Sequence, residues 1–216
     1  AYETFATNIA EHGVYGWAPD QPGAYWAVGP AAIYAAGYMV FGTGSTLAVV
    51  LPNMLSSIVV ICGLFDLGRR WFDRRVGVIA ALLFAIWPLT IQFTTVLASE
   101  LHFMALSVMA LVTWERSALT MRGILYLVFS GIFLAAATYV RPIALLIPAA
   151  IVIASTIRTF AISWQDLARA AGTTALIFLL VAPWSARNER VFGEPVFMST
   201  NFWANFWMGN NPDTSG

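Results

Sequence analysis

The chain of 216 residues is 59% hydrophobic and only 10% charged. A typical soluble domain carries about 25% charged residues, so this composition excludes an ordinary soluble protein and predicts a membrane protein. The 11 basic residues are all arginine and are balanced by 11 acidic residues, which excludes the polybasic surface that nucleic-acid binding needs. A single cysteine, Cys62, excludes an internal disulfide framework and a cysteine metal site.

The chain opens with an amphipathic segment. In "AYETFATNIAEHGVYGW", Tyr2, Phe5, Ala6 and Ile9 recur at helical spacing, with polar residues elsewhere on the helical wheel. This pattern predicts a helix that lies in the membrane interface.

Most of the remaining chain reads as membrane-spanning helices, each of which needs about 20 mostly apolar residues. The run 24–41 is rich in Gly, Ala and Tyr, and three placements stay open for it: spanning the bilayer, dipping into it, or lying in the interface. The predicted fold is therefore an all-α, polytopic transmembrane helical bundle with exoplasmic interfacial helices. The predicted spans are 46–65, 76–97, 100–114, 123–140, 143–157 and 170–184.

Arginine placement predicts the orientation of the bundle, because short cytoplasmic loops collect basic residues. If the loops around 66–75, 115–122 and 158–169 are cytoplasmic, eight arginines lie on that side and three lie on the other. The same alternation of spans places Glu100, Arg141, residues 1–23 and residues 186–216 together on the exoplasmic side.

Glu100, in "TTVLASELHF", is an isolated carboxylate between two apolar stretches. An ionisable group near the membrane is costly and indicates a base, a metal ligand or a substrate contact. The alternative is a helix start, with Ser99 as the cap and Glu100 in the first turn, where the helix dipole favours an anion. His102, two positions later, is off the face of Glu100, and we interpret it as an interfacial histidine.

Arg141 stands at a tight corner before Pro142, between two predicted spans. Its planar fork of donors suits a phosphate at the level of the lipid headgroups. The alternative is an arginine that reaches to ordinary headgroups.

The tail beyond the last span carries amides and aromatic rings at intervals of four residues. Asn201 and Asn205 would form one strip of a short helix, beside Phe202, Trp203, Phe206 and Trp207. Amides hydrogen-bond sugar hydroxyls and aromatic faces stack on sugar rings. An aromatic belt that anchors the protein at the interface is the alternative.

Motifs for nucleotide binding, zinc proteolysis and serine hydrolysis are absent from the sequence. Five segments in order, "GPAAIYAAGYMVFG", "LGRRWFDRRVGVIAALLFAIWP", "ASE", "AAATYVRPIALLIP" and "APWSARNERVFGEPVFMSTNFWANFWMGNNP", instead resemble the bacterial branch of GT-C membrane glycosyltransferases. This branch is similar to dolichyl-phosphate-mannose protein mannosyltransferases (glycosyltransferase family 39) and to the lipid A aminoarabinose transferase. The resemblance covers nearly the whole chain.

The resemblance implies an inverting glycosyltransferase of the bacterial inner membrane, with its active side facing the periplasm. Its partners would be a polyprenyl-phosphate sugar and an acceptor lipid, glycan or protein. Glu100 would assist as a second carboxylate or a metal ligand, and Arg141 would hold the lipid phosphate. Arg187 and Asn188 would be secondary contacts to phosphate or sugar. The principal acidic residue is expected upstream of Ala1, in a chain cut at both ends. The resemblance implies no certain cofactor and leaves a divalent metal open.

Two other functions stay open. A transporter or flippase for a lipid-linked intermediate would also need charged residues in the membrane, although near its midplane. A noncatalytic membrane subunit would keep only the fold.

Overall fold

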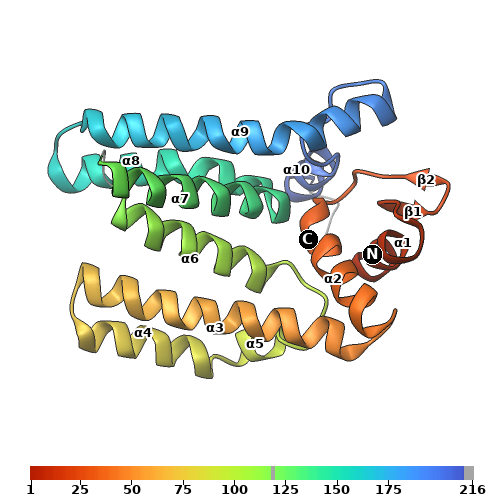
Figure 1. Ribbon diagram of the computed structural model, residues 1–216, viewed down its shortest axis with the longest axis horizontal. Coiled ribbons are helices and arrows are strands. Elements are labelled where there is room, and N and C mark those ends of the chain that lie inside the picture. Colours follow the sequence, from red (N-terminus) through yellow and green to blue (C-terminus); the bar gives the residue numbers. More distant parts are fainter. Residues whose placement is uncertain (118–119, 212–216) are drawn as a thin grey trace.

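The computed structural model describes residues 1–117 and 120–211, and these residues are almost entirely helical (Figure 1). The one sheet among them is a short antiparallel pair, β1 with β2, that follows the first helix. The elements are α1 (Tyr2–His12), β1 (Gly16–Ala18), β2 (Gln21–Pro22), α2 (Val28–Phe41), α3 (Thr46–Trp71), α4 (Arg74–Ile86), α5 (Pro88–Gln92), α6 (Glu100–Arg116), α7 (Met121–Val140), the 3-10 helix η1 (Pro142–Leu146), α8 (Ile147–Thr159), α9 (Trp164–Phe192) and α10 (Phe202–Asn210).

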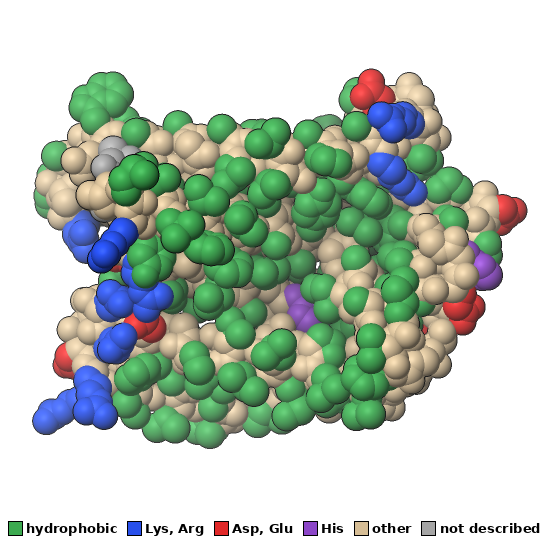
Figure 2. Space-filling model, in the orientation of Figure 1, with side chains coloured by type: hydrophobic (Ala, Val, Ile, Leu, Met, Phe, Trp, Pro, Cys, Tyr) green, Lys and Arg blue, Asp and Glu red, His purple; other side chains and the backbone are tan. Residues whose placement is uncertain are grey.

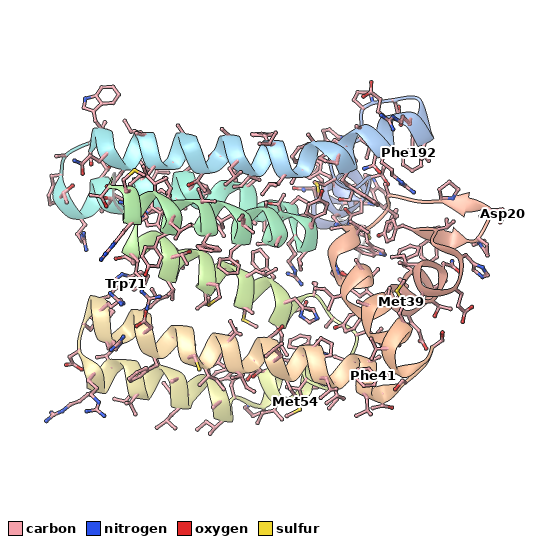
Figure 3. The ribbon with its side chains drawn as sticks, in the orientation of Figure 1. Asp20, Met39, Phe41, Met54, Trp71 and Phe192 are labelled. Atoms are coloured by element: carbon pink, nitrogen blue, oxygen red, sulfur yellow. The ribbon has the colours of Figure 1, made fainter. Side chains whose placement is uncertain are left out.

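Within the described residues, four helical stretches are long and apolar enough to cross a membrane. They are Thr46–Trp71, Met121–Val140, Pro142–Thr159 and Trp164–Phe192, and each contains one of the predicted spans. Large apolar side chains cover the outside of the bundle (Figure 2), where a bilayer would meet them. Met54 of α3 is one of these, 47% exposed on the outer face in Figure 3.

The prediction of a single continuous span over 76–97 is wrong. Helix α4 ends at Ile86, Trp87 is extended with φ −69° and ψ 120°, and Pro88 begins the short α5. The reason is local, because a proline disfavours the helical conformation for the residue before it. Residues 93–99 then form no helix. The following helix, α6, contains the predicted 100–114 and has 17 residues, or about 25 Å.

The run 24–41 becomes α2, which lies across the ends of the long helices in Figure 1. Its 14 residues rise only about 21 Å, short of the roughly 30 Å of hydrocarbon, so α2 is too short to span. It comes very close to the end of α7. A Cβ on Gly29 would lie 2.6 Å from the carbonyl oxygen of Tyr139, so only glycine permits this contact.

The predicted amphipathic helix at the N-terminus is present as α1, but its apolar face is covered by protein rather than by lipid. Phe5 and Ala6 are fully buried. Ala6 packs with Tyr34 and Ala35 of α2, and Phe5 packs with Tyr15. Helices α1 and α2 thus form one layer over this end of the bundle.

The opposite end carries the predicted arginine cluster. The α3–α4 and α8–α9 turns both lie at this end of the bundle (Figure 1), and Figure 2 shows basic side chains gathered there. Asp66 accepts hydrogen bonds from Arg69, Arg70 and Arg116 at 2.6 to 3.0 Å, which ties α3 to α6. Trp71 and Phe192 mark the two ends of the bundle in Figure 3.

Candidate active site

A cavity of about 880 Å³ opens at the end of the bundle covered by α1 and α2. Its walls come from segments that are far apart in the sequence: the start of α1, the approach to α2, the residue before α6, the corner between α7 and η1, and the region around α10. Polar groups line one part of it and aliphatic and aromatic groups line the rest. The lining residues used below are Ser99, Arg141, Ile143, Leu146, Asn201, Phe202, Asn205 and Phe206.

Arg141 is held at the corner between α7 and η1. It is extended, with φ −145° and ψ 116°, because Pro142 follows it and begins η1. The Nε and Nη2 atoms of Arg141 donate to the Ser99 hydroxyl oxygen at 2.9 and 2.8 Å. Nη2 also forms an ion pair with the Glu100 carboxylate. The guanidinium further lies over the Phe103 ring, 5.9 Å from its centre.

The structure thus brings the predicted Glu100 and Arg141 into direct contact, which the sequence placed only on the same side of the membrane. Both side chains keep access to solvent, at 33% for Glu100 and 41% for Arg141. An ion pair between a carboxylate and a guanidinium that are both this exposed can exchange partners, because neither charge is buried in the protein interior. Glu100 occupies the first turn of α6, as the helix-start alternative expected.

Ser99 is a residue of this cluster for which the sequence indicated only a capping role. It was expected to cap α6, but its side chain makes no capping hydrogen bond. The residue is only 3% exposed, and its hydroxyl oxygen accepts both donors of Arg141 instead. Its position directly before Glu100 was the only available signal.

Asn201 and Asn205 lie where the short helix predicted in the tail begins, and that helix is present as α10. Both residues line the cavity together with Phe202 and Phe206. The carbonyl oxygen of the Asn201 side chain accepts a hydrogen bond from the Ser199 hydroxyl at 2.9 Å. Amides and aromatic rings therefore share one wall of the cavity.

The segment before α10 is anchored to the bundle, which fixes that wall. Met198 is 2% exposed and packs among residues of α7 and α9. The Trp184 indole donates to the Met198 carbonyl at 3.1 Å, and the Thr200 amide donates to the Ala24 carbonyl at 2.8 Å. These contacts place α10 over the corner that carries Arg141.

Arg187 and Asn188 do not line this cavity. Arg187 Nη1 donates to the Gly23 carbonyl at 2.8 Å and to the Asn188 side-chain oxygen at 3.0 Å. The Asn188 amide nitrogen donates to the Val196 carbonyl at 3.1 Å, and this residue is fully buried. These contacts join the N-terminal hairpin and the tail to α9. That the two residues also contact substrate stays a prediction.

His102 is buried between helices rather than exposed on the surface of the protein, and its level relative to the membrane interface stays a prediction. It is 2% exposed, with Nδ1 2.8 Å from the Ser56 hydroxyl of α3. Its ring meets the Tyr34 ring edge-on at 5.4 Å. It therefore fixes the first turn of α6 to α2 and α3.

The part of the chain that the structure describes contains no obvious set of metal ligands. No group of three or more His, Cys, Asp and Glu side chains gathers there. Among the described residues of these four types, Glu100 is the one that pairs with Arg141.

Most of the chain matches a known protein family. The sequence model of the dolichyl-phosphate-mannose-protein mannosyltransferase family matches residues 22–186, more than half of the chain. The chain belongs to this family. The match runs from β2 into α9, so it includes Glu100 and Arg141 but neither Arg187 nor α10. Neither a curated protein nor a solved structure matches the chain.

Membership in the mannosyltransferase family agrees with the architecture. The family is one of membrane glycosyltransferases, and the described residues include four helices able to cross a bilayer. The protein is thus a glycosyltransferase of a membrane, with a largely apolar cavity at one end of its helical bundle that Ser99 and Arg141 help to line.

Proposed function

We propose that this protein transfers a sugar from a polyprenyl phosphate to an acceptor, with inversion at the anomeric carbon, in the cavity next to Arg141. The observation that carries the proposal is the Ser99–Glu100–Arg141 cluster, an exchangeable acid–base pair at the edge of a largely apolar cavity. By the orientation that the arginines predict, this end faces the periplasm of a bacterial inner membrane.

Arg141 would hold the phosphate of the donor. A guanidinium binds phosphate oxygens through parallel hydrogen bonds, and the corner before Pro142 holds its backbone in one conformation. On the same side of the cavity, Ile143 and Leu146 are 62% and 60% exposed. These aliphatic side chains of η1 offer a surface for the prenyl chain. The phosphate of the donor would thus contact Arg141 while its hydrocarbon chain contacts apolar side chains next to it.

Glu100 would act once the donor phosphate competes for Arg141. With the guanidinium turned to the phosphate, the carboxylate is released to orient or deprotonate the acceptor hydroxyl. Arg141 meanwhile stabilises the negative charge that develops on the departing phosphate. Both halves of an inverting transfer are therefore available from one ion pair.

The wall formed by α10 suits the sugar. Asn201 and Asn205 offer amide donors and acceptors to hydroxyl groups, and Phe202 and Phe206 offer ring faces. Arg187 and Asn188 would act indirectly, by holding in place the loops that contain Gly23 and Val196. The family resemblance adds a principal acidic residue upstream of Ala1 and leaves a divalent metal open, and both remain predictions.

The transporter alternative receives less support from the geometry. Binding sites of transporters lie near the bilayer midplane, whereas this cavity is formed at one end of the bundle by α1, α10 and the α7–η1 corner. A noncatalytic subunit has no need for an acid–base pair beside a cavity, but only an activity measurement separates it from the enzyme.

The test follows transfer of labelled sugar from polyprenyl-phosphate donors by the full-length protein in membrane vesicles. Glu100→Gln is compared with wild type at equal folded abundance, and Glu194→Gln, an exposed glutamate in the tail, is the matched control. We expect Glu100→Gln to lower turnover by about 10², or roughly 2.7 kcal/mol of transition-state stabilisation. Equal turnover would make Glu100 a helix-start residue. No transfer by wild type from any donor would favour transport or a noncatalytic role.

A further inference from the structure

The non-helical segment 93–99 ends at Ser99 and leads directly into Glu100. Outside a helix, its backbone groups need partners from elsewhere, and in a helical bundle few are available. Asn53 of α3 supplies one set. Its amide nitrogen donates to the Val96 carbonyl at 2.9 Å and lies 3.4 Å from the Thr94 carbonyl.

Tyr34 of α2 supplies the second set. Its hydroxyl oxygen accepts the Ala98 amide at 2.9 Å, and it lies 2.8 Å from the Ala98 carbonyl and 2.9 Å from the Asn53 side-chain oxygen. A phenol has one proton, so it donates to one of these two oxygens at a time. Two side chains from two helices thus clamp the backbone of this segment at Thr94, Val96 and Ala98.

This clamp is buried and connected to the helix that carries Glu100. Tyr34 and Asn53 are 0% and 1% exposed. His102 joins the same group through its edge-on contact with Tyr34 and its hydrogen bond with Ser56. In the described part of the chain, the buried Nε2 atom of His102 has no hydrogen-bond partner. A buried polar atom without a hydrogen-bond partner lowers the stability of the folded protein.

We propose that Tyr34 and Asn53 are positioning residues, which hold Ser99 and Glu100 in register with Arg141. The inference rests on the proposed function and adds to it. Glu100 begins α6 immediately after the clamped segment, so movement of Ala98 shifts the carboxylate relative to the guanidinium. A misplacement of about 1 Å in a catalytic constellation is enough to cost about 10²-fold in rate.

The competing explanation is that the clamp only satisfies buried backbone groups and stabilises the fold. The two explanations differ in a double-mutant cycle with Glu100. If Tyr34 acts through Glu100, its removal has no further effect on rate once Glu100 is replaced. If it only stabilises the fold, its effect at equal folded abundance is small and multiplies with that of Glu100→Gln.

The variants are Tyr34→Phe, which removes one oxygen atom, and Asn53→Leu, with Ser130→Ala as the matched control. Ser130 is 1% exposed and donates one hydrogen bond from α7 to the Ala110 carbonyl of α6 at 3.0 Å. We expect Tyr34→Phe to lower kcat about tenfold, with Ser130→Ala within about twofold of wild type. The double variant Tyr34→Phe, Glu100→Gln should match Glu100→Gln alone.

Hydrogen exchange gives a readout that does not depend on activity. We expect Tyr34→Phe to speed exchange of the Ala98 amide and of the Phe103 amide, which donates to the Ser99 carbonyl at 2.9 Å and closes the first turn of α6. Ser130→Ala should change neither amide.

Multiplying rate effects, or unchanged exchange at Phe103, would overturn the proposal. If Glu100→Gln transfers sugar as well as wild type, the proposed role of Glu100 fails, and the exchange result alone then decides whether the clamp positions this turn.

Discussion

Replacement of Arg141 tests the centre of the proposed site, and two substitutions separate its charge from its shape. Arg141→Lys keeps a positive charge, but its single nitrogen replaces a planar fork. Arg141→Gln keeps some hydrogen bonding and removes the charge. Arg190→Gln serves as the control, because Arg190 is an exposed arginine at the same end of the bundle.

The expected magnitudes follow from the contacts. Arg141 uses Nε and Nη2 to hold the Ser99 hydroxyl and uses Nη2 again for the Glu100 carboxylate. A lysine cannot keep these contacts and bind a phosphate as well, so at least one charge-assisted hydrogen bond is lost. Such a bond contributes about 1.5–3 kcal/mol, which corresponds to a loss of about 10- to 100-fold in kcat/KM. Loss of the charge in Arg141→Gln should cost about 10²- to 10³-fold.

The assay is sugar transfer in vesicles at varied donor concentration, with rates corrected for folded protein. A fall in kcat indicates that Arg141 stabilises the transition state, whereas a rise in KM alone indicates equal binding of donor and transition state. Activity of Arg141→Gln within about twofold of the Arg190→Gln control would refute the reasoning. Arg141 would then be an anchor for Glu100 or a contact for ordinary lipid headgroups.

Two further predictions concern the N-terminal hairpin. Arg187→Gln removes the charge-assisted hydrogen bond to the Gly23 carbonyl, so we expect a loss of about 1.5–3 kcal/mol in the free energy of unfolding and faster proteolysis of residues 13–23. The KM for the donor should not change. A raised KM without loss of stability would instead make Arg187 a substrate contact. Burial raises the pKa of Tyr15, whose hydroxyl donates to the Trp26 carbonyl at 2.8 Å. Because this pKa is higher in the folded than in the unfolded state, stability should be retained below pH about 10 and fall as the pH rises above it. Thermal unfolding of Tyr15→Phe should show a weaker alkaline loss, and an identical pH dependence would contradict this explanation.

Composition and periodicity were sufficient for the class of protein and for most of its helices. Long apolar runs have one physical solution in a bilayer, so α3, α7, α8 and α9 could be predicted with their approximate bounds. The amphipathic pattern of α1 and the four-residue spacing of Asn201 and Asn205 likewise predicted helices that the structure contains. Local proline chemistry also explains the break at Trp87, although hydropathy alone did not indicate it.

Tertiary packing decided what the apolar faces meet. The apolar face of α1 has the same sequence pattern whether it rests on lipid or on α2, and only the structure shows that α2 covers it. The burial of His102 could likewise not be predicted from its neighbours in the sequence, because it depends on Ser56 and Tyr34, which are more than 40 residues away.

Hydropathy depends only on local composition, so the sequence alone was enough to indicate a membrane protein, and the alternation of its apolar runs predicted which polar residues share an end of the bundle. The tertiary structure decided which of those residues touch. Glu100 and Arg141 are 41 residues apart and form an ion pair, whereas Arg187 and Asn188 turn to the loops they support. Hydrogen bonds and ion pairs act over only a few ångströms, so they depend on how α6, α7 and α9 pack, and that packing cannot be read from any single segment.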